Sequence, residues 1–133
     1  MCVPRDLFDD PSVPDVELLY RGIHPQHLKE GPAVSSAAFM SKANPHVSVD
    51  LGSLCTPRET YQRRAGDAGV VQLVTGDVRK LTPGVARDPT EDNPAHALLI
   101  HDFTLTNSKW KEVARRLAKA CVWAIGPATH SLE

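Results

Sequence analysis

The sequence predicts a single α+β domain in which a small mixed sheet is packed by two or three short helices. The length of 133 residues is that of one ordinary domain, and the composition, 41% hydrophobic and 23% charged, is that of a globular protein. Short strand-like segments also alternate with helical ones along the chain. We therefore expect a flexible arm over residues 1–15, one domain over 16–131 and a cloning remnant at 132–133.

The arm is predicted from its prolines and its like charges, which disfavour a packed core. These residues are Pro4, Asp6, Asp9, Asp10, Pro11, Pro14 and Asp15. Leu7 and Phe8 leave open the alternative that the arm packs on this domain or on a partner.

Six segments are predicted to be strands because they are rich in β-branched or other apolar residues. They are residues 16–21, 33–40, 46–51, 70–74, 95–103 and 121–125. In the third, Val47, Val49 and Leu51 alternate with polar residues, which is typical of a strand buried on one face. The polar residues 87–94, which precede the predicted strand at 95–103, are expected to form a loop.

Four segments are predicted to be helical: a single turn at 25–30, a helix from 57 to about 65, a short helix at 75–81 and a long helix at 108–120. Thr56, Pro57 and Glu59 have the spacing of a capping box with proline at the first helical position. Asn107 or Ser108 is expected to cap the long helix. Its apolar residues recur at helical spacing, and we expect a core of Trp110, Val113, Leu117, Trp123, Leu19, Val71, Leu73 and Leu99.

Composition excludes several classes of function. With 15 Lys and Arg against 16 Asp and Glu, the net charge of −1 provides no general attraction for nucleic acid, so the basic residues of the 108–120 helix are expected to be solvated. No apolar run is long enough to span a membrane. Neither a Gly-rich dinucleotide motif nor a P-loop is present.

The cysteines and histidines predict neither disulfides nor a metal site. The three cysteines (Cys2, Cys55 and Cys121) are odd in number and widely spaced, and no secretory signal begins the chain, so we expect a cytoplasmic protein with reduced thiols. His96 and His101 are five residues apart, which places them on opposite faces of a strand. Cys55 precedes a helix whose dipole favours a thiolate, but an inert buried thiol is the favoured interpretation.

The candidate ligand-binding residues lie at predicted strand ends, where a rigid scaffold can present polar side chains to solvent. They are Arg21, His24, Ser36, Asp50 and His96. Arginine supplies a forked donor for phosphate or carboxylate, and histidine carries a proton near neutral pH. The alternative is that Arg21 and Asp50 pair across the sheet while both histidines are solvated.

Three of these residues, Arg21, His24 and Ser36, lie in segments with a family resemblance. Residues 20–24 (Tyr-Arg-Gly-Ile-His) and 35–39 (Ser-Ser-Ala-Ala-Phe) resemble the strands of ADP-ribosyltransferases on which an Arg or His and a Ser hold NAD. The resemblance implies these roles for Arg21 and for Ser35 or Ser36. The family also uses a later Glu, which orients the ribose. This sequence departs from the family at that position, because Glu91 lies in a predicted loop and no Glu-x-Glu occurs.

A second resemblance covers more of the chain but implies no activity. The stretches LYRGIHP, SSAAF, VSVDL and NPAHA are similar to those of a group of small uncharacterised bacterial proteins. We therefore expect a small cytoplasmic domain that binds a small anionic ligand or a protein partner, without a cofactor. The alternative is an ADP-ribosyltransferase-like enzyme, or a degenerate relative, that uses NAD.

Overall fold

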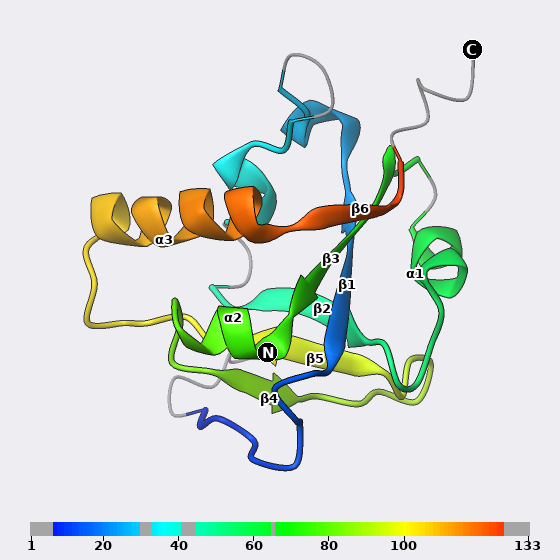
Figure 1. The fold of residues 1–133 in the computed structure, drawn as a ribbon, viewed down its shortest axis with the longest axis horizontal. Helices are drawn as coiled ribbons and strands as arrows, with labels where there is room; N and C mark the ends of the chain where they lie inside the picture. Colours follow the sequence, from blue (N-terminus) through cyan, green and yellow to red (C-terminus); the bar gives the residue numbers. More distant parts are fainter. Residues whose placement is uncertain (1–6, 30–32, 41–44, 65, 127–133) are drawn as a thin grey trace.

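A six-stranded antiparallel sheet forms the centre of the computed structural model, which describes residues 7–29, 33–40, 45–64 and 66–126 (Figure 1). Its strands are β1 (Leu18–Ile23), β2 (Val47–Leu51), β3 (Gly69–Val74), β4 (Val85–Arg87), β5 (His96–Leu99) and β6 (Val122–Ile125). They lie in the order β4-β5-β2-β1-β3-β6. The predicted α+β class is confirmed, but each described strand pair is antiparallel, whereas the sequence predicted a mixed sheet.

Helices cover both faces of the sheet. They are α1 (Pro57–Arg63), α2 (Thr75–Arg79), α3 (Asn107–Ala120) and the 3-10 helices η1 (Pro25–His27) and η2 (Ser36–Phe39). α3 packs against η2 and leads directly into β6, whereas α1 contacts β1 and β3 from the opposite side of the molecule (Figure 1). No helix among the described residues is both long enough and apolar enough to cross a bilayer.

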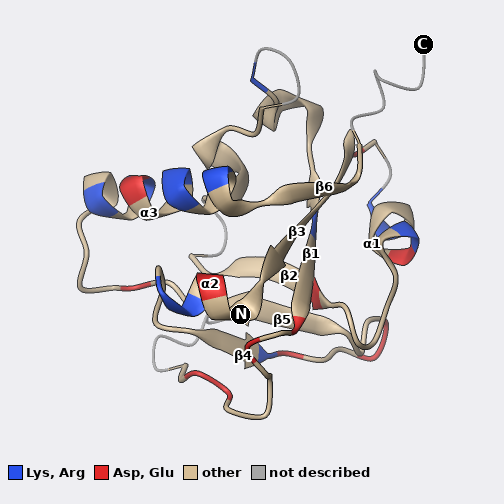
Figure 2. Ribbon diagram, viewed as in Figure 1, with Lys and Arg blue, Asp and Glu red and all other residues tan. Residues whose placement is uncertain are grey.

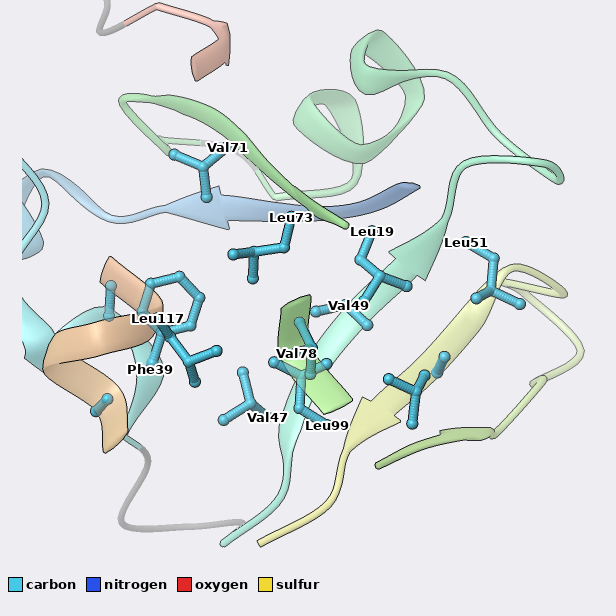
Figure 3. Close-up of a cluster of buried hydrophobic side chains, with 14 of the residues drawn as sticks. Leu19, Phe39, Val47, Val49, Leu51, Val71, Leu73, Val78, Leu99 and Leu117 are labelled. Carbon is cyan, nitrogen blue, oxygen red and sulfur yellow. The ribbon is translucent and has the colours of Figure 1, made fainter. Parts of the chain in front are cut away.

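The main hydrophobic core lies between the sheet and the α3–η2 layer (Figure 3). The predicted core residues Leu19, Val71, Leu73, Leu99, Trp110 and Leu117 are at most 3% exposed. Val113 and Trp123 are half-buried and pack against this cluster. The predicted core is thus confirmed, because the helical spacing correctly identified the inward face of α3. A smaller cluster around Tyr20 and Val70 lies on the other face, where Tyr61 of α1 packs against it.

Three local predictions differ from the structure. The predicted strand at 33–40 is η2, because the Ser35 side chain accepts a hydrogen bond from the Ala37 amide and starts a helical turn. The strand β4 was not predicted, since three residues are too few to show alternation. The cap of α3 is Thr106, whose hydroxyl accepts from the Lys109 amide, and not Asn107 or Ser108.

Residues 7–15 of the predicted arm are packed on the domain. Val13 is fully buried in the main core. Asp9 Oδ1 accepts hydrogen bonds from the Val85 amide at 2.9 Å and from Arg79 Nε at 3.0 Å. Asp15 pairs with Arg79 Nη1 at 2.7 Å. Arg79 and Arg87 thus neutralise the acidic charges that favoured the prediction of a flexible arm. Residues 1–6 of the predicted arm lie outside the described part of the chain.

The capping box at α1 is confirmed. The Glu59 amide donates to Thr56 Oγ1 at 3.2 Å, and the Thr56 amide donates to Glu59 Oε1 at 2.9 Å. We expect Thr56→Ala to lower the free energy of unfolding by about 1 kcal/mol, because the helix amide loses its acceptor. Urea unfolding followed by circular dichroism measures this loss. An unchanged stability would show that the cap does not contribute to holding α1 in place.

Candidate functional site

A pocket of about 220 Å³ opens on the α1 side of the sheet, where β1 and β2 diverge. The register of these strands pairs only Leu19 with Leu51 and Tyr20 with Asp50. The part of β1 after Tyr20 and the part of β2 before Asp50 are therefore not paired with each other. The pocket is lined by Tyr20, Arg21, Gly22, Ser48, Val49, Asp50, Thr60, Arg63, Arg64, Asn93 and His96.

Asp50 organises one wall of this pocket. Its side chain is buried, and its Oδ2 atom accepts hydrogen bonds from Thr60 Oγ1 and Arg63 Nη1, each at 2.7 Å. Its Oδ1 atom accepts from Asn93 Nδ2 at 2.8 Å. One carboxylate therefore joins β2, α1 and the loop before β5. Because these three donors occupy both of its oxygens, we assign Asp50 a positioning role.

The end of α1 supplies two arginines to the pocket. Thr60 and Arg63 are three residues apart and thus lie on one face of the helix, which is directed at Asp50. Arg64 follows as the C-cap residue, and its side chain is 54% exposed. Its Nε atom lies 3.6 Å from the buried Asp67 carboxylate, a contact beyond ordinary hydrogen-bond length. Most of the donor capacity of Arg64 is therefore available to a ligand.

Arg21 places a third guanidinium beside the gap between β1 and β2. Side chains alternate across a strand, so Arg21 leaves the face opposite to Tyr20 and Asp50. Its Nε donates to the Ala38 carbonyl oxygen and its Nη1 to the Ser48 carbonyl oxygen, each at 2.7 Å. Burial, with the nearby charge of Arg64, lowers the pKa of Arg21 to about 10. The group therefore stays positive at neutral pH, but its forked donor is largely used by the protein.

His96 and Tyr20 complete the polar lining. His96 lies directly across from Asp50 in the β2–β5 pair, and its Nδ1 lies 3.0 Å from Asp88 Oδ2. In the described part of the chain its Nε2 atom has no hydrogen-bond partner, so this nitrogen is available to a ligand. Burial raises the pKa of Tyr20, with smaller contributions from Cys55 and Glu17. The phenol thus remains a hydrogen-bond donor at neutral pH.

The structure brings together three of the five predicted site residues. Arg21, Asp50 and His96 line the pocket described above. Ser36 instead lines a second pocket beside α3. His24 is exposed and precedes η1, where its Nδ1 accepts from the Gln26 amide. Arg21 and Asp50 also do not pair across the sheet, since they leave opposite faces and Asp50 pairs with Arg63.

The sequence prediction missed the contributions of α1 and of the loop before β5. Thr60, Arg63 and Arg64 were within the predicted helix, and their spacing could have shown a polar face. Nothing in the sequence indicated that this face would reach Asp50 of β2, because that contact depends on the strand order. Asn93 precedes a proline and was assigned to a polar loop.

The Cys55 side chain is buried beside Thr60. Its Sγ lies 3.5 Å from the Leu51 carbonyl oxygen and 3.6 Å from Thr60 Oγ1. Burial raises the pKa of this thiol, although the Thr60 hydroxyl acts in the opposite direction. Burial therefore opposes formation of the Cys55 thiolate. Among the described residues, no group of three His, Cys, Asp or Glu side chains could hold a metal ion.

Comparisons of the chain with protein-family models, with curated proteins and with solved structures give no match.

Proposed function

We propose that the pocket between β1, β2 and α1 binds a small anion, such as phosphate or a short carboxylate. The observation that supports this most directly is the balance of charge in the lining. Three arginines line the pocket, and the one carboxylate among its described lining residues, Asp50, already accepts three hydrogen bonds from the protein. Guanidinium groups match the geometry of phosphate and carboxylate oxygens.

The size of the pocket supports a small ligand. Sites for drug-sized molecules enclose about 300–1,000 Å³, whereas this pocket encloses about 220 Å³. A dinucleotide such as NAD is larger than this space. The ADP-ribosyltransferase resemblance assigns NAD binding to Arg21 and to Ser35 or Ser36. Arg21 lines this pocket, whereas Ser36 lines a different pocket and Ser35 lines neither of the two.

We place the protein in the cytoplasm under this proposal. The described cysteines, Cys55 and Cys121, are both free, which is typical of a reducing compartment. Phosphorylated and carboxylated metabolites are abundant there as ligands.

The proposal predicts saturable phosphate binding that depends on Arg64. Calorimetric titration with inorganic phosphate at constant ionic strength measures the affinity. Because Arg64 supplies charge-assisted hydrogen bonds, we expect Arg64→Met to weaken binding about tenfold. Arg116→Met is the matched control, since Arg116 is 65% exposed on α3 and does not line the pocket.

Equal affinities of the two variants would overturn the assignment of the site. If the parent protein shows no saturable heat with phosphate, the same titration with short mono- and dicarboxylates tests the other anions. Absence of binding by both classes would refute the proposed function.

A further inference from the structure

A second and larger pocket lies beside the C-terminal half of α3. It encloses about 600 Å³ and is bounded by α3, by the start of β6 and by the chain around Lys29 and Ser36. This volume falls within the range of about 300–1,000 Å³ that is usual for small-molecule sites. The chain on its far side is held by main-chain hydrogen bonds, including that from the Lys29 amide to the Ala33 carbonyl oxygen at 2.7 Å.

The inner surface of this pocket is largely apolar. Val71 forms part of it and is fully buried, while Val34 and Trp123 are half-buried. Val122 of the edge strand β6 is 55% exposed at the same place. Removing the exposed apolar surface of Val122, Val34 and Trp123 from water favours binding of a hydrocarbon chain or ring.

The rim of the same pocket is positive. Lys29, Arg115 and Lys119 line it, and they come from two segments that are far apart in the sequence. Figure 2 shows the positive residues that follow one another along α3. Arg115 pairs with Glu112, whereas neither Lys29 nor Lys119 has an acidic partner among residues 7–29, 33–40, 45–64 and 66–126. Two ammonium groups are thus available to an anionic group at the rim.

We propose that this second pocket binds a small molecule that joins an anionic group to an apolar chain or ring, such as a medium-chain carboxylate. The apolar part lies against Val122 and Trp123, and the anionic group contacts Lys29 and Lys119. This proposal is independent of the phosphate site, because the two pockets share no lining residue.

Sodium decanoate, used below its micelle-forming concentration, is the probe for this site. Because Trp123 lines the pocket and the other tryptophan, Trp110, is buried in the core, we expect a saturable change in tryptophan fluorescence. Calorimetric titration provides an independent affinity. Decanol and acetate, which each lack one half of the proposed ligand, are expected to bind at least about tenfold more weakly.

Two double variants separate the site from the general positive charge of α3. Each exposed charge contributes a few-fold in affinity, so we expect Lys29→Met/Lys119→Met to weaken decanoate binding about tenfold. Lys109→Met/Lys111→Met removes the same charge from residues of α3 that do not line the pocket, and it is expected to retain the parent affinity. Thermal unfolding of both variants shows whether the loss reflects binding or folding, since a lysine in the last turn also interacts with the helix dipole.

Equal weakening by both double variants would overturn the proposal, as would decanol binding as tightly as decanoate. Absence of decanoate binding, or binding to phosphatidylglycerol vesicles without binding to free decanoate, would also refute it. Phosphate binding at the first pocket is measured separately and is unaffected by any of these outcomes.

Discussion

Replacement of Asp50 by alanine is expected to lower the free energy of unfolding by about 3 kcal/mol, because breaking a buried ion pair leaves its partners without compensation. The carboxylate accepts hydrogen bonds from Thr60, Arg63 and Asn93, and its side chain is only 9% exposed. Thr60 is itself buried and would lose its acceptor. Chemical unfolding monitored by tryptophan fluorescence measures the change.

The same variant is also expected to lose phosphate binding. Without Asp50, Arg63 Nη1 and Asn93 Nδ2 lose the acceptor that directs both groups at the pocket, and the hydrogen bond from the Ala95 amide to Asn93 Oδ1 remains. Asp92→Ala is the matched control, since Asp92 is exposed in the loop before β5 and substitutions of that kind change stability by less than about 0.5 kcal/mol. A similarly small effect of Asp50→Ala would contradict the role of Asp50 as the residue that joins β2, α1 and this loop.

Truncation of Leu117 to alanine is expected to lower the free energy of unfolding by about 2–5 kcal/mol, because it leaves a cavity in the main core. Leu117 is fully buried between α3 and the sheet, among Phe39, Val47 and Leu73 (Figure 3). Urea unfolding measures the loss. Leu54→Ala removes the same atoms from a side chain that is 52% exposed, and this control is expected to lose far less stability. Equal losses in the two variants would show that α3 does not pack as described.

Much of the fold could be predicted because its signals are local. The Thr56–Glu59 capping box and the apolar face of α3 depend on residues close together in the sequence, and both are confirmed. The direction of the strands depends on how long connections cross the molecule, which the sequence does not specify, and the predicted mixed sheet was wrong. The packing of residues 7–15 depends on Arg79 and Arg87, about seventy residues away, and could not be seen locally.

The site was predicted only in part, for a similar reason. The sequence predicts Asp50 and His96 as site residues because they lie on strands near loops, and the register of β2 and β5 places them opposite one another. Arg63 and Arg64 lie at the end of the predicted helix, and the sequence predicts no site role for them. Their role follows from tertiary contacts, because α1 packs against β1 and β3 and Arg63 reaches Asp50 of β2.

A phosphate titration followed by amide ¹⁵N–¹H chemical shifts tests the proposed anion site most directly, because it reports where the anion binds. We predict shifts that saturate with one dissociation constant and are largest at Asp50, Arg64, Asn93 and His96, which surround the pocket. Shifts that increase linearly without saturating, or that are confined to the basic residues of α3, would contradict the proposed site.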